Sequence, residues 1–297
     1  MAQLLSNTSK VEYLRNEVAK RTIERLSFIK RDFPKLMDLG SHSGNFAKVL
    51  NEGDDEDTRL VRNKIGEILM VDSSKEMLHR WDDDPFNTEL KVRKLVVDEE
   101  ELNHKELEAN KFDGIVSNLS LHWINDLPTT LKKINNCLKP DGLFLGSMIC
   151  EDSIFELRTS LQLAELERKN GMSMSRISPM IKVDDMTNLL KMAKFNMVTI
   201  DVEEIIVDYP DILAMMEDLQ LMGENNANKQ GFENLDRDVL ISAQAIYSKF
   251  YGEADADVSH LPLTFRVMFM IGWKESGNQP QPLQRGSGEL NLKDVLG

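Results

Sequence analysis

A turn that contains two glycines, between a short apolar strand and a helix, constrains the fold of this chain most strongly. Residues 36–39 predict a buried strand with Asp38 at its carboxyl end. Gly40 and Gly44 follow, and residues 45–50 predict a helix whose free N–H groups face the turn. Because glycine lacks a Cβ, the backbone here can approach a ligand closely. This D-x-G-x-x-x-G spacing is typical of the first strand–helix junction of a doubly wound α/β sheet, where nucleotides or nucleosides bind.

His42 stands in the middle of this turn, where nucleoside pockets of this kind usually carry a third glycine. A side chain at this position either narrows the pocket or points to solvent, if the backbone tolerates the geometry. The sequence leaves both possibilities open.

Two more predicted strands end in carboxylates. Residues 65–72 end at Asp72, about 30 residues after the turn, where a carboxylate can accept hydrogen bonds from both ribose hydroxyls. A solvated helix N-cap is the alternative role for Asp72. Asp98 follows the strand predicted at 90–97 and could meet an adenine amino group, or simply belong to a solvated acidic turn. The glycine turn and Asp72 together predict an adenosine ligand.

The fourth predicted strand, 112–117, runs into a loop beside the glycine turn. The backbone groups of Asn118, Leu119 and Ser120 could hold the amino-acid part of a cofactor. Asn118, Ser120, His122 and Trp123 are candidates for shaping the reaction space. Packing is an equally good explanation for His122 and Trp123.

Five strands that alternate with helices over about 115 residues predict a mostly parallel sheet. Three local predictions can be checked directly: a capping box at 9–12 that starts the first helix, a helix end plus surface loop at 51–63, and a polar helix at 105–111. The later part predicts further helices and strands. Its helices are at 152–169, 183–194, 211–222 and 236–251, its strands are at 196–209 and 264–273, and loops are expected at 172–179 and 224–230.

Composition excludes several classes of protein. A net charge of −14 and a pI of about 4.9 argue against nucleic-acid binding, which needs a basic surface. No apolar run is long enough to span a membrane, and we expect neither an apolar signal region nor a clear transit segment at the N-terminus. The two cysteines lack metal-ligand spacing, and His104-x-Glu106 is a poor iron-ligand signal, so no metal site is predicted.

Three features together resemble the class I S-adenosylmethionine-dependent methyltransferases: Asp38 to Gly44, Asp72, and the strand 112–117 before Leu138 to Gly142. The resemblance implies a Rossmann-like α/β fold with a seven-stranded, mostly parallel sheet and helical insertions in the C-terminal half. The strands at 196–209 and 264–273 match the antiparallel closing hairpin of that fold. Asp38, Gly40, Gly44, Asp72, Asp98, Asn118 and Leu119 are then the candidate S-adenosylmethionine-binding residues.

A narrower set of segments closely resembles the mitochondrial respiratory complex I assembly factor 5 family, the arginine-hydroxylase family of complex I assembly. The matching segments are Ser120–Pro128, Glu156–Glu165, Arg176–Pro179, Asp208–Pro210, Met216–Glu224 and Met270–Lys274. The resemblance implies hydroxylation of an arginine on an iron–sulfur subunit, in a protein associated peripherally with the matrix face of the inner mitochondrial membrane. Other assembly factors are possible partners. The related malonyl-carrier-protein methyltransferases, methylation of a protein, and a non-catalytic assembly scaffold are the alternatives.

This resemblance also suggests a division of the chain and contacts for a protein substrate. We expect an N-terminal helix in 1–34, a methyltransferase-like domain in 35–274 with its cofactor half in 35–150 and its insertions and closing strands in 151–274, and a tail in 275–297. Arg158 and Glu165 lie two helical turns apart and either contact that substrate or pair with other helices. Glu217, Asp218 and Glu224 could receive an arginine by bidentate pairing, or form a solvated face.

Overall fold

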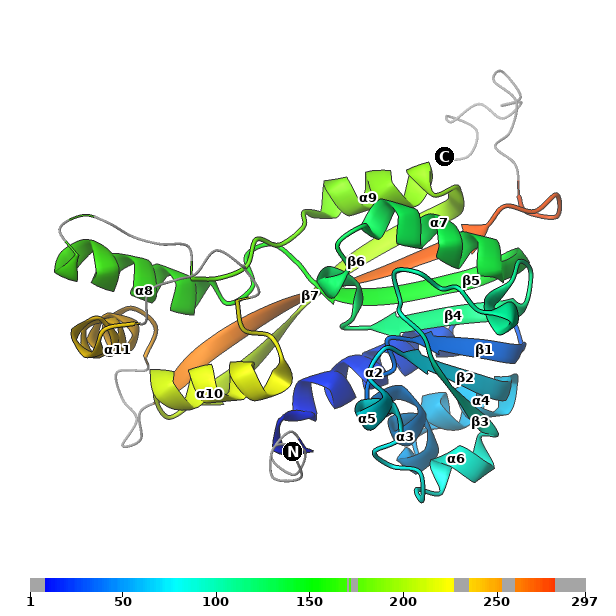
Figure 1. Ribbon diagram of the computed structural model, residues 1–297, viewed down its shortest axis with the longest axis horizontal. Coiled ribbons are helices and arrows are strands. Elements are labelled where there is room, and N and C mark those ends of the chain that lie inside the picture. The colour runs from blue at the N-terminus through cyan, green and yellow to red at the C-terminus, as the bar shows by residue number, and fades with distance from the viewer. Residues whose placement is uncertain (1–8, 170, 172–175, 227–234, 253–259, 281–297) are drawn as a thin grey trace, which may run out of the picture.

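The computed structural model describes residues 9–169, 171, 176–226, 235–252 and 260–280. Seven strands form one sheet with the order β3-β2-β1-β4-β5-β7-β6 (Figure 1). The strands β1 to β5 are parallel, and β7 runs antiparallel between β5 and β6. The predicted seven-stranded, mostly parallel α/β sheet with an antiparallel closing pair is therefore confirmed.

The helices and strands alternate along the first half of the chain. The strands are β1 (Phe33–Leu39), β2 (Ile65–Asp72), β3 (Val92–Val96), β4 (Phe112–Asn118), β5 (Leu138–Ile149), β6 (Phe195–Tyr209) and β7 (Leu261–Lys274). The α-helices are α2 (Tyr13–Ser27), α3 (Asn45–Glu52), α4 (Glu56–Lys64), α5 (Lys75–Leu78), α6 (Phe86–Glu89), α7 (Leu127–Cys137), α8 (Phe155–Arg168), α9 (Val183–Met192), α10 (Ile212–Met222) and α11 (Arg237–Tyr251). Three short 3-10 helices are η1 (Ser9–Val11), η2 (Lys105–Leu107) and η3 (Leu121–Trp123).

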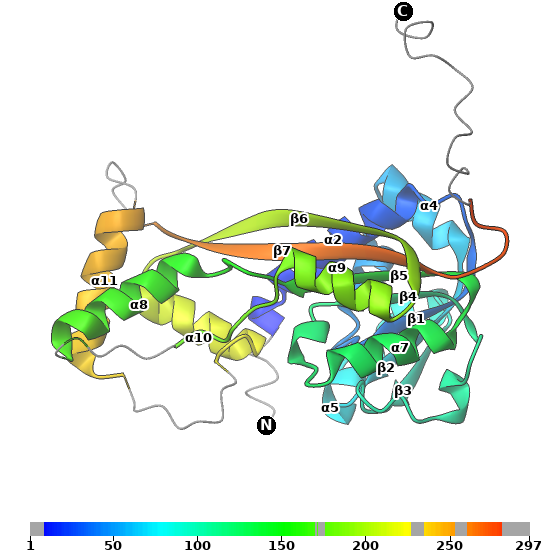
Figure 2. The ribbon, with the colours of Figure 1, turned by 90° about the horizontal axis from the view of Figure 1, so that it is seen from above.

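Helices cover both faces of the sheet (Figure 2). On one face α2, α3 and α4 bury residues such as Ile23, Leu50 and Val61 against β1, β2 and β4. On the other face α7 and α9 bury Ile134 and Leu190. The first helix, α2, is also tied to the edge strand, because Arg21 and Arg25 both form ion pairs with Glu203 of β6. Thr22 of α2 also donates to the Oδ1 of Asn118 at 2.7 Å, so α2 lies against the carboxyl end of β4.

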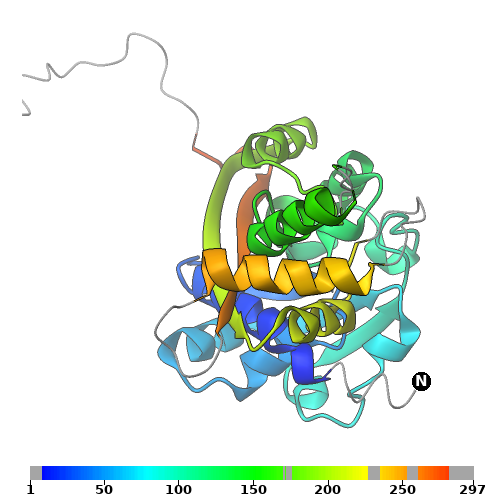
Figure 3. The ribbon, with the colours of Figure 1, turned by 90° about the vertical axis from the view of Figure 1, so that its left-hand side faces the viewer.

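The closing strands β6 and β7 extend beyond the parallel part of the sheet (Figure 1). Three helices, α8, α10 and α11, pack around this extended part, and we call them the helical extension. The β5–β7 pairing stops at Ile149 and Val267, and residues 261–266 of β7 pair as a strand only with β6. Figure 3 shows α11 crossing between α8 and α10. Tyr247 of α11 and Phe265 of β7 lie in the core shared by these elements.

Three local predictions are wrong. Residues 56–64 form α4 rather than a loop, because Asp55 caps the helix by accepting the Thr58 N–H at 2.9 Å. Only the single 3-10 turn η2 forms within 105–111. The capping box at 9–12 does not form, since α2 begins only at Tyr13. The Glu12 carboxylate instead accepts hydrogen bonds from Ser43 in the glycine turn and from Arg80, which follows α5.

The predicted strands and helices of the second half are confirmed within a few residues, β7 starting three residues early. Parts of the loops expected at 172–179 and 224–230, of the N-terminal unit and of the tail lie outside the described residues. In the described part of the chain, no helix has the length and apolar character needed to cross a membrane.

Candidate functional site

The glycine turn forms as predicted, and its glycines are required by geometry. Gly40 and Gly44 have φ of 66° and 90°, which side chains rarely adopt. A Cβ on Gly40 would lie 2.0 Å from the Oγ of Ser120. The backbone N–H of Gly40 donates to the carbonyl of Val71 at 2.8 Å, which ties the turn to the end of β2. The loop after β4 therefore lies directly against the turn.

Buried polar atoms without partners surround this turn. The Oδ2 of Asp38, the Oγ of Ser41 and the Nδ2 of Asn118 accept or donate no hydrogen bond among the described residues. The Oδ1 of Asn118 is occupied, since it accepts hydrogen bonds from Thr22 at 2.7 Å and Ser147 at 3.0 Å. Buried polar groups are usually paired, so these three unpaired atoms indicate a place for a polar ligand.

The three residues border a cavity of about 10 Å³, which Arg15 of α2 and His42 also line. This volume holds about one water molecule. The chemistry of the lining fits a charged, polar ligand, but anything larger than water requires α2 or the loop after β4 to move away from the turn.

The two charged side chains that line the cavity suit opposite charges of a ligand, with Asp38 suited to a cationic group and Arg15 to an anionic one. Burial, and to a lesser extent the neighbouring Asp72 carboxylate, raise the pKa of Asp38 to about 8. Burial lowers the pKa of Arg15, an effect that Glu224, Asp72 and Glu12 oppose. An ammonium or sulfonium group beside Asp38 would stabilise the ionised carboxylate that burial disfavours.

His42 adopts a glycine-like conformation with φ of 52° and lines the cavity. Burial, with the positive charges of Arg15 and Arg80, lowers its pKa to about 3. The imidazole is therefore neutral at pH 7. Of the two possibilities left open by the sequence, the structure selects a side chain that narrows the cavity.

Asp72 lies at the end of β2 beside the turn, outside the lining of the cavity, and is already hydrogen-bonded by the backbone. Its Oδ2 accepts the N–H of His42 at 2.7 Å, and its Oδ1 accepts the N–H of Ser74 at 2.8 Å. Burial raises its pKa, while these two bonds and Arg15 lower it. Asp98 is exposed and its Oδ1 accepts the N–H of Glu100 at 2.8 Å, so the structure does not bring it to the cavity.

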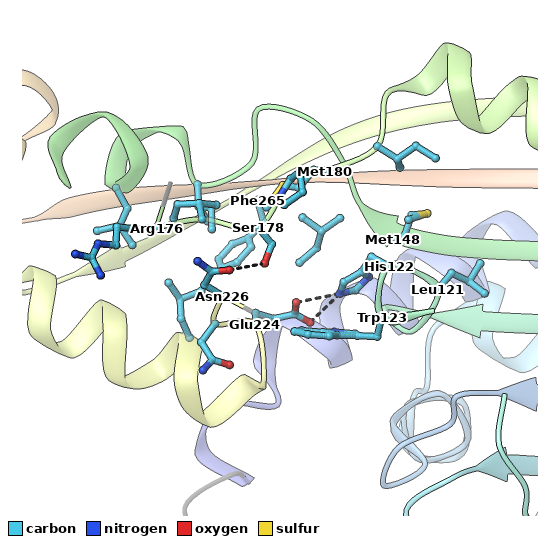
Figure 4. Close-up of a pocket in the computed structure, with 18 of the residues that line it drawn as sticks. Leu121, His122, Trp123, Met148, Arg176, Ser178, Met180, Glu224, Asn226 and Phe265 are labelled. Carbon is cyan, nitrogen blue, oxygen red and sulfur yellow. Dashed lines mark hydrogen bonds and ion pairs between the residues drawn. The ribbon is translucent and has the colours of Figure 1, made fainter. Parts of the chain in front are cut away.

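A second and much larger pocket, of about 780 Å³, lies between the sheet and the helical extension (Figure 4). Most of the residues that line it are apolar. They include Leu121, Ile124, Met148, Ile154, Leu157, Leu161, Met180, Met216, Leu219 and Phe265. The predicted candidates His122 and Trp123 also line this pocket, whereas Asn118 lines the glycine-turn cavity.

His122 and Glu224 form the central polar contact of this pocket (Figure 4). The Nε2 of His122 lies 2.9 and 3.2 Å from the two carboxylate oxygens of Glu224, whose side chain is 6% exposed. The Nη2 of Arg15 lies 3.9 Å from the same carboxylate. Because Arg15 also lines the glycine-turn cavity, Arg15 and Glu224 connect the two sites.

A second ion pair lies at the far end of the pocket. Arg176 donates to the Oε1 of Glu165 at 2.7 and 3.0 Å, and Glu165 is fully buried. The other member of the predicted pair on α8, Arg158, is partly exposed and lies 3.5 Å from Asp152. Glu165 thus pairs within the chain, but with a loop residue rather than with another helix as expected.

The remaining predicted acidic residues do not enter the pocket. Glu217 is exposed, and Asp218 accepts a hydrogen bond at 3.1 Å from the hydroxyl of Tyr13, which also bonds Tyr209. Sequence patterns do not single out Arg15, which looks like any polar residue beside an apolar helix stripe. Within the described residues, no group of three or more His, Cys, Asp or Glu side chains is placed to hold a metal ion.

Comparison with known proteins agrees with this fold. A family model described as a methyltransferase domain matches residues 11–200. The YcgJ protein of Bacillus subtilis has the same fold, with a TM-score of 0.54 at 15% identity, over 88% of this chain and 99% of that chain. The sheet order, the glycine turn and its cavity thus define a methyltransferase-domain protein, and this class supports S-adenosylmethionine binding.

Two relatives narrow the class. The protein named "Arginine-hydroxylase NDUFAF5, mitochondrial" from Danio rerio is 39% identical over 294 residues, which cover 99% of this chain and 85% of that protein. The protein of the same name from Homo sapiens is 40% identical over 287 residues, covering 97% and 77%. The chain belongs to the NDUFAF5 arginine-hydroxylase family, as the sequence motifs predict.

Proposed function

We propose that this chain binds S-adenosylmethionine at the glycine turn and hydroxylates an arginine of an iron–sulfur subunit during assembly of respiratory complex I. The observation that supports it most is the buried, unpaired Asp38 carboxyl in a chain that matches named arginine-hydroxylases over nearly its whole length. The names of those relatives suggest a mitochondrial location and a role in complex I assembly. We place the protein at the matrix face of the inner membrane as a peripheral partner of its substrate and of other assembly factors.

Polar groups of the cavity, together with Asp72 at the adjoining end of β2, have roles in holding the cofactor in this proposal. Asp72 would bind the ribose hydroxyls, and Asp38 would face the positively charged part of the methionine moiety. Arg15 and the free Nδ2 of Asn118, both hydrogen-bond donors, would hold its carboxylate. Gly40, Gly44 and Leu119 supply backbone that the cofactor can approach. When bound, S-adenosylmethionine supplies an electrophilic methyl group on a sulfonium. Hydroxylation converts a C–H bond into C–OH and needs an oxidant in addition to these residues.

Calorimetric titration with S-adenosylmethionine tests the cofactor site. We expect saturable binding to the natural chain and at least a tenfold loss of affinity in Asp72→Asn. Asp98→Asn is the matched control, and a loss there would show that this exposed carboxylate also contributes. No binding to the natural chain at millimolar ligand would contradict the proposal and favour a scaffold.

Mass spectrometry of the client subunit tests the reaction. A gain of one oxygen on an arginine after incubation with the natural chain, its cofactor and an oxidant is the expected result. A gain of one CH₂ would instead assign methyl transfer, and the same gain on malonyl carrier protein would select the related methyl ester chemistry. An unchanged client mass would contradict both enzymatic roles.

A further inference from the structure

Glu224 occupies a distinctive position in the large pocket. Among the described residues that line this pocket it is the only acidic one, and its side chain is 6% exposed. Of the three acidic residues that could receive an arginine, Glu217 faces solvent and Asp218 bonds Tyr13. The structure thus singles out one carboxylate from three.

Glu224 is already in contact with two basic side chains, as expected of a carboxylate that binds a cation. The imidazole of His122 approaches both carboxylate oxygens, at 2.9 and 3.2 Å. The guanidinium of Arg15 lies 3.9 Å from Oε1, beyond hydrogen-bond distance but within the range of an ion pair. A planar guanidinium prefers two parallel hydrogen bonds to a carboxylate, and Arg15 makes neither of them here.

The other charges of the pocket do not oppose a cationic ligand. Arg176, the basic residue in the lining, is paired with the fully buried Glu165. Around Arg15, the carboxylates of Glu12 and Asp72 add negative charge. A pocket built to hold a malonyl carboxylate would instead present a basic group where Glu224 stands.

We infer that Glu224 binds the guanidinium of the substrate arginine in the large pocket, with His122 occupying this carboxylate when no substrate is bound. The inference rests on the proposed function, because it assigns the arginine-binding residue of that same reaction. The apolar lining would pack the aliphatic part of the arginine and its neighbours, in a volume ordinary for such a site. Glu224 is a substrate-binding residue in this scheme, and Arg15 connects substrate binding to the cofactor cavity.

Binding of matched peptides tests the inference. The probes are a peptide of about ten residues with one central arginine and the same peptide with citrulline, which replaces the guanidinium by a neutral group of similar shape. We expect the natural chain to bind the arginine peptide at least tenfold more tightly by calorimetry. Glu224→Gln should lose this preference, and Glu217→Gln, on the exposed side of α10, should keep it.

S-adenosylmethionine titration of the same variants separates this inference from the proposed function. We expect Glu217→Gln to bind the cofactor within about threefold of the natural chain and Glu224→Gln to bind it saturably, which also shows that both variants are folded. Equal affinity of the natural chain for the two peptides, or a full arginine preference in Glu224→Gln, would overturn the inference even if the cofactor binds. Loss of cofactor binding by the natural chain would overturn the proposed function instead.

Glu224→Asp provides a second measurement should Glu224→Gln fail to fold. Aspartate keeps the charge but withdraws the carboxylate by one methylene, so the arginine preference should fall to between that of the natural chain and none. An undiminished preference in a folded Glu224→Asp would contradict recognition by this carboxylate.

Discussion

The glycine-turn cavity and the large pocket are connected through Arg15 and Glu224 but differ in whether their buried carboxylates are paired. The cavity has a volume of about 10 Å³, and Asp38 and Asn118 each keep an unpaired atom beside it. The pocket has a volume of about 780 Å³, and its charged groups are paired within the chain. Unpaired buried groups cost stability until a ligand satisfies them, whereas paired groups hold a preformed space open.

This difference indicates which of the two sites must change its shape when a ligand binds. The cavity is too small for the cofactor that we propose it binds, so such binding would require α2 or the loop after β4 to move. The pocket has the volume, and a substrate there needs only to exchange one ion pair for another. Four substitutions test this difference between the two sites.

Gly40→Ala should have the largest effect, because its Cβ would lie 2.0 Å from Ser120 at a φ of 66°. We expect a loss of about 4 kcal/mol in the free energy of unfolding, together with loss of cofactor binding. Urea unfolding and calorimetry measure the two. Gly223→Ala is the control, since it has a φ of 80° and no described atom near the added Cβ, and it should lose about 1 kcal/mol. Equal losses in both would show that close approach to Ser120 has no role.

Glu165→Gln tests whether the second ion pair of the pocket is structural. Removing the charge leaves Arg176 without its buried counter-ion and should lower the free energy of unfolding by about 3 kcal/mol. Asp152→Asn, which removes an exposed partner of Arg158, should cost less than about 1 kcal/mol. Urea unfolding compares them, and a Glu165→Gln variant as stable as the natural chain would mean that this pair does not hold the pocket open.

Asp38→Asn tests the unpaired carboxyl through pH. Folded Asp38 keeps its proton up to a pKa of about 8, whereas an unfolded aspartate loses it near about 3.9, so this group lowers stability as pH rises between those values. His42, whose folded pKa is about 3, has the opposite effect and raises stability as pH rises from about 3 to about 6.5, because the unfolded chain then binds a proton that folded His42 does not. Between pH 6.5 and 8 the ligand-free natural chain should therefore lose about 2 kcal/mol that Asp38→Asn does not lose. Parallel urea-unfolding curves of the two proteins over this interval would refute the raised pKa.

His42→Gly should have the smallest effect. Glycine relieves the left-handed backbone and widens the cavity, so we expect about 1 kcal/mol of added stability and severalfold tighter cofactor binding. Lys91→Gly relieves a similar φ of 49° far from the cavity and should change stability alone. Thermal unfolding and calorimetry distinguish them, and unchanged affinity in His42→Gly would show that the imidazole does not limit the cavity.

The local sequence predicts the glycine turn and its cavity much better than the large pocket. The spacing of Asp38, Gly40, Gly44 and Asp72 depends on one strand–turn–helix unit and the next strand, so patterns reveal it directly. Glu224 contacts His122, about 100 positions away, and Arg15, about 200 positions away. Periodicity within a short segment cannot predict such distant pairs. The loop prediction at 51–63 failed for a similar reason. Its helix is polar, with Val61 as one of few buried residues, so the apolar stripe is faint.

The place of β7 in the sheet has a consequence for biosynthesis. β7 lies between β5 and β6, although it follows both in the chain, and residues 210–260 separate β6 from it. At about 5–20 residues per second, a ribosome needs roughly 3 to 10 s to make that interval. Until β7 is complete, β6 has no described strand neighbour to bond, so the growing chain carries an unpaired edge fifteen residues long. Nascent chains that pause in this interval should be the species that chaperones capture.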